Sequence, residues 1–400
     1  MSSRENRKKL IQSIEEKRGS KLITYITSDR PGLCAQITSE IVPIIHEHIL
    51  AINQTERKHL DLLIYSRGGE SDVPWAIISM FREYTAGGSF DVLIPFRAHS
   101  AATVISLGAD EIVMTKKAEL GPIDATMASG PYNPREPDNN QILPIPVEDV
   151  MGYFSLMEKI GCERPDEKMQ GFNLITNHIH PLALGNVNRL FEETKLVAFR
   201  LLSTRSVPFS EDKNHEIIRK LSSETYSHSH AICRTEAKKY IGLNQVKNAE
   251  DSNIDSELWE LYKEYKELFE FENPFRPEEY IIVNGLVEHT WKNLKLACVE
   301  SLNRFDIYEQ DIHTKKLKQV PPQIQLNLNN FTFPTVNLPN LPKGITSEMI
   351  NTIVSQIVNQ TINESLNQAV LTATQQLVSS LPDAGFQNTV SNGRWKMEDD

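Results

Sequence analysis

The sequence lacks several features that would assign its 400 residues to a membrane or secreted class. No run of about 20 consecutive apolar residues is present, which excludes a conventional transmembrane helix. The opening segment MSSRENRKKLIQSIEEK is charged throughout and does not resemble a secretory signal peptide. Only four cysteines occur, none in a CxxC pair or at metal-ligand spacing, a pattern typical of reduced thiols. We therefore expect a cytoplasmic protein without a membrane span.

Two further absences concern ligands. No GxxxxGK[ST] segment occurs, so the chain has no P-loop and any dependence on ATP would have to come from a partner. The 53 acidic residues outnumber the 42 basic ones, the formal net charge is −11, and no dense cluster of Lys and Arg is present. An acidic chain of this kind is a poor match for the phosphates of nucleic acid. We expect neither a cofactor nor a nucleic-acid partner.

What the sequence does contain is an alternation of buried strands and amphipathic helices. Residues 21–28, 60–65 and 91–96 are β-branched or apolar runs that are typical of strands buried on both faces. Between them, residues 35–52 and 73–84 repeat apolar positions at helical spacing. This βαβ order predicts an α/β fold with a mainly parallel sheet.

The composition changes toward the C-terminus. Residues 246–319 alternate like a small α+β extension, and residues 320–345 are rich in Pro and Asn, as in an extended linker. Residues 346–381 carry Ile, Val and Leu near helical spacing but only two charged side chains. We expect this helix to bury its apolar stripe against other copies of the chain or against a protein partner. Residues 382–400 are predicted to be a disordered tail.

Ser100 stands where a strand-like segment meets a small-residue helix, in PFRAHSAATVISLGADEIVM. One interpretation is a helix N-cap, since a serine oxygen accepts a hydrogen bond from an early helical N–H. The other is an exposed nucleophile. Gly68 and Gly69, which would otherwise be an ordinary turn, follow the preceding strand, and parallel strand ends meet at one edge of a sheet. Their N–H groups, with that of Ala101, would form an oxyanion hole beside Ser100.

Three segments carry a resemblance to a known family: LIYSRGGESDVPWAIISMFREY, IPFRAHSAATVISLGADEIVMTKKAELGPIDA and HSHAICRTEAKKYIGL. Together they resemble the Clp/crotonase superfamily of serine peptidases and, more narrowly, the serine dehydrogenase proteinase family, which is related to signal peptide peptidase A. The resemblance implies a Clp/crotonase-like ββα-superhelix core over residues 1–245. It also implies hydrolysis of peptide bonds by an activated serine, and assembly of the chain into a homo-oligomer.

The resemblance also implies where the general base lies. Clp proteases have a histidine where this chain has Asp124, and an acidic residue where it has residues 227–230, SHSH. The two residue types are therefore transposed. We predict that His228 is the base and that Asp124 orients it, the logic of a catalytic triad in a different order. His230 is the alternative base.

Two other groups of basic side chains are weaker candidates. A serine–lysine dyad, as in signal peptide peptidases, would use Lys116 or Lys117. His178 and His180 resemble a metal-binding pair, but no third ligand is nearby in the sequence. We interpret these two histidines as structural and predict no metal site.

One departure from the family pattern follows the nucleophile. The family usually has Ser-Ala-Gly-Thr where this chain has Ser100, Ala101, Ala102 and Thr103. Alanine needs a negative φ that glycine does not need, so a changed turn is expected there. The predicted function is an ATP-independent serine endopeptidase acting on polypeptides, and the alternative is a binding or assembly module with a weakened site. An acyl-CoA enzyme is disfavoured because no basic pocket for the CoA phosphates can be identified.

Overall fold

The structure is a computed structural model. It describes residues 3–85, 87–123, 126–127, 130–136, 140–224, 227, 229–318, 346–354, 356–357, 360–361, 364–365, 368 and 382–398. Asp124, His228 and the Pro/Asn-rich segment 320–345 lie outside the described residues, so the expectations for them stay predictions.

One mixed sheet of eight strands forms the centre of the fold, in the order β12-β7-β5-β4-β1-β13-β14-β15. The first five of these strands run parallel, and β13 joins β1 in the antiparallel direction. This arrangement confirms the predicted α/β class. The strands are β1 (Lys21–Thr27), β4 (His59–Tyr65), β5 (Ser89–Ile94), β7 (Ile112–Met114), β12 (Val246–Asn248), β13 (Glu288–Ser301), β14 (Arg304–Lys318) and β15 (Asp383–Met397).

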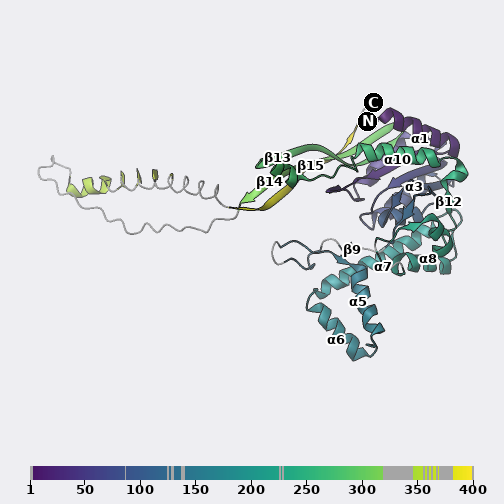
Figure 1. Ribbon diagram of the computed structural model, residues 1–400, viewed down its shortest axis with the longest axis horizontal. Coiled ribbons are helices and arrows are strands. Elements are labelled where there is room, and N and C mark those ends of the chain that lie inside the picture. The colour runs from purple at the N-terminus through teal and green to yellow at the C-terminus, as the bar shows by residue number, and fades with distance from the viewer. Residues whose placement is uncertain are drawn as a thin grey trace. The chain divides into compact units, whose positions relative to one another are not determined.

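Helices cover both faces of the parallel strands (Figure 1). Because successive side chains of a strand point to opposite faces, Leu22 and Ile26 of β1 pack on one side, and Ile23 and Tyr25 on the other. The first side holds α1 (Arg4–Arg18) and α10 (Asp255–Leu268). The second side holds α2 (Ile41–Ala51), α3 (Val73–Thr85), α4 (Ala101–Leu107), α7 (Pro181–Ser203) and α8 (Glu211–Ser223).

A second, three-stranded sheet lies at the carboxyl end of β4. It has the order β11-β8-β6, from β11 (Ile232–Cys233), β8 (Glu119–Leu120) and β6 (Arg97–Ala98). A β-bridge between Ser66 and Ala98 ties it to the residue after β4. The segment that precedes β11 and the segment that follows β6 are therefore both attached to this small sheet.

Shorter elements complete the chain. They are β2 (Asp29–Arg30), β3 (Leu33–Cys34), β9 (Thr126–Met127), β10 (Ile145–Pro146), α5 (Val147–Lys159), α6 (Pro165–Thr176), α9 (Arg234–Glu236), α11 (Pro277–Val283), the 3₁₀ turns Gln54–Glu56 and Ala249–Ser252, and the π-helical turn Ala237–Ile241. No helix in the described ranges is long and apolar enough to cross a membrane.

The separate extension predicted for residues 246–319 is not found as such. The chain divides into one unit of residues 1–276, 293–310 and 392–400, and another of residues 277–292 and 311–391. Strand β12 and helix α10 belong to the first unit, and Thr24–Thr27 of β1 pair with Ala297–Glu300 of β13. The alternation in the sequence indicated strands, but it could not show that β13 pairs with β1, where Thr27 of the first strand lies opposite Ala297.

The predicted disordered tail at residues 382–400 is wrong, because Asp383–Met397 form strand β15 beside β14. The composition of β15 is polar, which favours disorder, but its place in the sheet beside β14 is supported by side-chain contacts as well. Trp395 packs on Tyr308 at 5.6 Å between ring centroids. Asn388 accepts a hydrogen bond of 2.6 Å from Thr314. A strand that depends on pairing with its neighbour has little signal in its own sequence.

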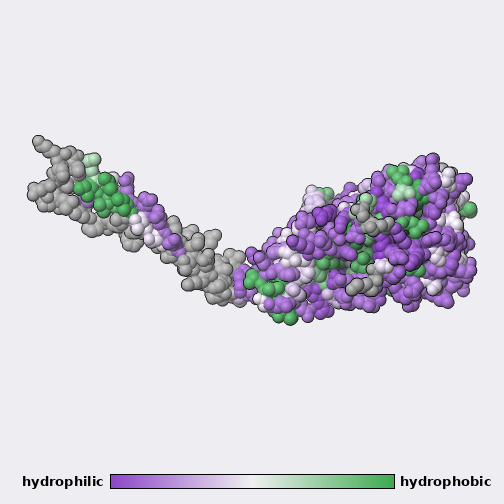
Figure 2. Space-filling model, turned by 90° about the horizontal axis from the view of Figure 1, so that it is seen from above, coloured by the Kyte–Doolittle hydropathy of each residue, from purple (hydrophilic) through white to green (hydrophobic). Residues whose placement is uncertain are grey.

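The helix predicted for residues 346–381 is present where the structure describes it most continuously, over 347–354. Its apolar side chains lie at the surface, and Figure 2 shows them gathered on one stretch of the helix. Met349, Ile353 and Ile357 are 53%, 52% and 59% exposed. The predicted linker before this helix lies outside the described residues.

Candidate active site

Ser100 lies between β6 and α4 in a backbone conformation that is unusual for any residue except glycine. Its φ is 49° and its ψ is −118°. Such a conformation costs about 1–3 kcal/mol and persists only where the surrounding structure imposes it. Sharp strand-to-helix turns of this kind present the nucleophile of many serine hydrolases. The strain at Ser100 is therefore the first observation that points to chemistry.

The hydroxyl of Ser100 does not cap the helix. Its side chain makes no capping hydrogen bond, and within the described part of the chain no partner is found for its Oγ. The N–H of Ala102 bonds to the carbonyl of His99 at 3.0 Å, and the N–H of Val104 to the carbonyl of Ser100 at 3.0 Å. The N-cap interpretation is therefore wrong, and the half-buried hydroxyl is available to a substrate.

Ala102, the departure from the family pattern, takes an ordinary helical place after the turn. Ala102 is fully buried inside α4 and is not among the residues with positive φ. The positive φ falls on Ser100 itself. A glycine at position 102 is therefore not needed for this backbone.

Gly68 lies directly against Ser100. Its φ is 109°, and a Cβ atom added to it would lie 2.6 Å from Ser100 Cβ and 3.1 Å from Ser100 Oγ. Gly69 is restricted for a different reason, since a Cβ there would lie 2.0 Å from the carbonyl oxygen of Ile37. Both positions therefore require glycine, which an ordinary turn would not.

The peptide between Gly68 and Gly69 is held from one side. The carbonyl of Gly68 accepts a hydrogen bond of 2.8 Å from the N–H of Ile37. Because the C=O and N–H of a trans peptide point in opposite directions, the N–H of Gly69 faces away from Ile37. Among the residues that the structure describes, neither this N–H nor that of Ala101 has an acceptor. Both are therefore free to donate to a developing oxyanion.

Gly68 contributes differently from the other two residues predicted for the oxyanion hole. Its N–H already donates to Ser66 Oγ at 3.1 Å. Gly68 thus supplies the close approach to Ser100, whereas Gly69 and Ala101 supply the free N–H groups.

Charged side chains surround the turn. His99 Nε2 lies 3.1 Å from Glu119 Oε1, and Arg97 donates to the same oxygen at 2.8 Å. Arg97 and Arg67 also pair with Asp29. Burial lowers the pKa of His99, which keeps its imidazole neutral at neutral pH. These contacts fix the strand that leads into Ser100.

Of the residues predicted to form the histidine base and its partner, the structure describes only His230, the alternative base. Asp124 and His228 lie outside the described residues. His230 Nε2 lies 2.8 Å from Glu236 Oε1, and the His230 side chain is 40% exposed. A carboxylate that orients a histidine is the arrangement that a general base requires.

The small sheet relates His230 to Ser100. Leu120 of β8 pairs with Ala98 of β6 on one side and with Ile232 of β11 on the other. Because β6 and β11 run in opposite directions, Ser100 and His230 each lie two residues beyond this row, at the same end of the sheet.

The lysines predicted as alternative bases are engaged elsewhere. Lys116 is 71% exposed and pairs with Glu250 at 3.5 Å. Lys117 Nζ lies 4.2 Å from the ring centroid of Trp259, a residue of α10. Helix α10 covers the face of the sheet opposite to the one that α4 covers. A dyad of Ser100 with either lysine is therefore disfavoured.

His178 and His180 do not form a pair with a third ligand in the described residues. His180 Nδ1 accepts the N–H of Leu182 at 3.2 Å as the N-cap of α7, and its ring stacks on Tyr132. These contacts give His180 a structural role at the start of α7.

Among the described residues, His59, Asp61 and Asp91 could hold a metal ion by their proximity. Arg18 from α1 donates to Asp61 at 2.6 Å and to Asp91 at 2.7 Å. Hydrogen bonds to the two aspartates raise the pKa of His59 to about 9. The two cations balance the two carboxylates, so the cluster is a buried ion network at the amino ends of β4 and β5.

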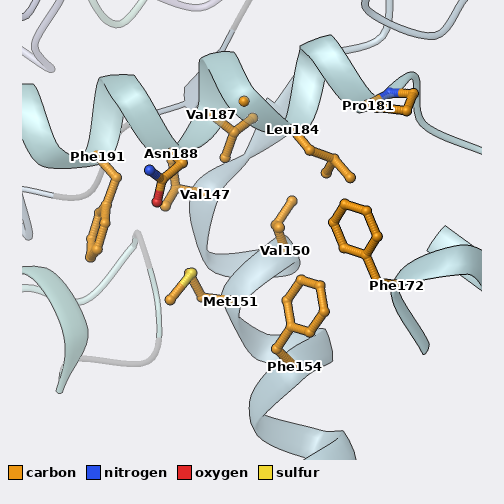
Figure 3. Close-up of a pocket in the computed structure, with 11 residues that line it drawn as sticks. Val147, Val150, Met151, Phe154, Phe172, Pro181, Leu184, Val187, Asn188 and Phe191 are labelled. Atoms are coloured by element: carbon orange, nitrogen blue, oxygen red, sulfur yellow. The ribbon is translucent and has the colours of Figure 1, made fainter. Parts of the chain in front are cut away.

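An apolar pocket of about 330 Å³ lies between α5, α6 and α7. Figure 3 shows Phe154 from α5, Phe172 from α6 and Leu184 from α7 pointing into it. Asn188 is the one amide in its lining. None of the residues around Ser100 lines this pocket, so it is separate from the candidate active site.

Residues 1–134 match the family model of the ClpP-like SDH-type serine proteinases. The predicted resemblance is thereby confirmed. The matched segment contains Gly68, Gly69 and Ser100. It ends before the segment that carries His228 and His230.

Two uncharacterized proteins of Methanocaldococcus jannaschii, MJ0137 and MJ1495, are each 26% identical to the chain over 65% of its length. The alignments cover 79% and 76% of those proteins. Among solved structures, a mutant of the 1510-N membrane-bound stomatin-specific protease matches at 16% identity and a TM-score of 0.32, over 61% of this chain and 85% of that one.

Proposed function

We propose that this chain is an ATP-independent serine endopeptidase in which Ser100 attacks the peptide carbonyl. The observation that carries the proposal is a strained serine whose hydroxyl has no partner among the described residues and which lies against Gly68. The match of residues 1–134 to a serine proteinase family supports the reaction class. We assign the core to the Clp/crotonase-like ββα-superhelix type on the same grounds.

The reaction follows from the positions of these groups. Ser100 Oγ adds to the carbonyl carbon while the base removes its proton, and the N–H groups of Gly69 and Ala101 stabilise the oxyanion. Collapse of the tetrahedral intermediate breaks the C–N bond, and the leaving amine takes the proton from the base. Water then hydrolyses the acyl-enzyme by the same route. We propose His228, oriented by Asp124, as the base, with the His230–Glu236 pair as the alternative.

Assembly and location are further parts of the proposal. We infer a cytoplasmic homo-oligomer to which the 346–381 helix contributes, or in which it binds a protein partner. The exposed side chains of Met349, Ile353 and Ile357 support this assembly. Exposed apolar side chains that lie together on one helix are typical of a surface that binds another protein. We expect the chain to hydrolyse its polypeptide substrate without using ATP itself.

Labelling with a fluorophosphonate tests the proposed nucleophile. An activated Ser100 is phosphonylated with loss of fluoride, and intact mass shows one added phosphonyl group per chain, which Ser100→Ala abolishes along with hydrolysis of casein. Ser106→Ala is the matched control, since Ser106 Oγ only bonds the carbonyl of Ala102 at 2.8 Å. A chain that is neither labelled nor active on casein would favour the alternative, a binding or assembly module.

A further inference from the structure

Two buried hydroxyls lie behind the candidate oxyanion hole, and the catalytic steps above do not use them. Thr27 Oγ1 donates to Ser66 Oγ at 2.9 Å, and the N–H of Gly68 donates to the same oxygen at 3.1 Å. Ser66 is fully buried and Thr27 is 1% exposed. A polar pair so far from solvent must be fixed by its own hydrogen bonds.

The main chain of Ser66 is fixed to the strand that leads to the nucleophile. Its N–H donates to the carbonyl of Arg97 at 3.1 Å, and its carbonyl accepts the N–H of His99 at 3.0 Å. These two bonds bracket Ala98, two residues before Ser100. The backbone of Ser66 is therefore fixed beside Ala98, close to Ser100 in the chain. The side chain of Ser66 holds the N–H of Gly68.

Gly68 needs such a restraint more than other residues do. With φ at 109° and no side chain, it could adopt several backbone conformations of similar energy. Rotation about its φ and ψ would turn the peptide that carries the N–H of Gly69. The bond from Ile37 N–H to Gly68 O fixes one end of this arrangement, and Ser66 Oγ fixes the other.

We propose that Ser66 is a positioning residue that aims the N–H of Gly69 at the oxyanion, with Thr27 holding the Ser66 hydroxyl. The inference rests on the proposed function, because an oxyanion forms only if Ser100 attacks a carbonyl. It assigns to Ser66 no contact with the substrate.

The effect of Ser66→Ala should appear in the transition state rather than in substrate binding. Loss of a whole oxyanion donor lowers kcat by about 10²–10³-fold, so misdirection of one should lower it by about 10–100-fold. We expect KM for a peptide substrate to change by less than about twofold. The affinity for a peptide boronate, whose tetrahedral adduct occupies the oxyanion hole, should fall by the same factor as kcat. Ser106 is another fully buried hydroxyl residue, and Ser106→Ala should change neither kcat nor the boronate affinity.

A readout without catalysis separates this inference from the proposed function. In Ser66→Ala, the N–H of Gly68 loses its acceptor, so amide hydrogen exchange at Gly68 should accelerate at least tenfold relative to Ser106→Ala, whether or not the protein is a peptidase. If the parent is inactive and unlabelled, the proposed function fails, and faster exchange still supports the restraint on Gly68. Unchanged exchange, or unchanged kcat and boronate affinity in an active parent, overturns the inference. Should Ser66→Ala not fold, Thr27→Val, which keeps Ser66 Oγ but removes its donor, is judged by the same measurements.

Discussion

Gly68 lies so close to Ser100 that a Cβ atom at position 68 would be 2.6 Å from Ser100 Cβ. This close approach brings the carboxyl end of β4 to the turn before α4. It also places the Gly68–Gly69 peptide beside the hydroxyl of Ser100, a residue whose backbone is strained. The candidate active site is therefore defined by two backbone conformations at least as much as by side chains.

Gly68→Ala should lower both stability and activity. Alanine at a φ of 109° costs about 1–3 kcal/mol of unfolding free energy, and its Cβ would push Ser100 out of position. Urea unfolding and casein hydrolysis measure the two effects. In contrast, Gly152→Ala should be neutral or stabilising by up to about 1 kcal/mol, because α5 is helical there and nothing lies within 4 Å of the added atom. Equal stability of the two variants would contradict this close approach.

Removal of Arg18 should be strongly destabilising. Its guanidinium joins the buried carboxylates of Asp61 and Asp91, and the Arg18 side chain is only 5% exposed. Arg18→Met leaves those carboxylates short of a partner, which should lower the unfolding free energy by about 3–5 kcal/mol. Arg164→Met, at an ion pair on the surface, should change it by less than about 1 kcal/mol. A loss at Arg18 no larger than at Arg164 would show that the network is not needed for stability.

Stability should depend on the protonation of His59. Its pKa is raised to about 9 in the folded chain, above the value near 6.5 of an unfolded histidine. A group with a raised folded pKa contributes stability that is fully present below the unfolded pKa and is lost as pH rises through the folded one. Unfolding free energy should therefore fall by about 1–3 kcal/mol between pH 6.5 and 9. His59→Asn should flatten this slope, and an unaltered slope in that variant would assign it to other groups.

The tail helix offers a test of assembly that leaves β15 intact. Replacing Ile353 and Ile357 by Gln removes two exposed apolar side chains from one row of the helix. If this row joins copies of the chain, light scattering should report a smaller assembly. Gln356→Ala, at a polar position of the same helix, should leave the mass unchanged. The same mass for all three proteins would exclude a contribution of this row to the assembly.

The sequence predicted the parts of the site that depend on local pattern and order. Ser100, Gly68 and Gly69 stand at strand ends, and the parallel sheet brings such ends together whatever the details of packing. The pattern could not show that Ser100 itself carries the positive φ, because that conformation is imposed by neighbours. It also could not show Ser66 as a restraint, since one serine in a strand has no signal of its own. β13 and β15 were missed as parts of the main sheet because their partners are distant in the chain.

The identity of the general base is decided by the pH dependence of two variants. With a histidine base, kcat/KM should rise through a pKa of about 6–7, because only the neutral imidazole accepts the proton of Ser100. If His228 is the base, His228→Gln should lower kcat/KM by several orders of magnitude, and His230→Gln by less than about tenfold. The opposite result would assign the role to His230, whose pairing with Glu236 at 2.8 Å already resembles an oriented base. Ser100→Ala is the reference for complete loss. A profile that rises only above about pH 8 and is insensitive to both substitutions would contradict a histidine base and indicate a lysine.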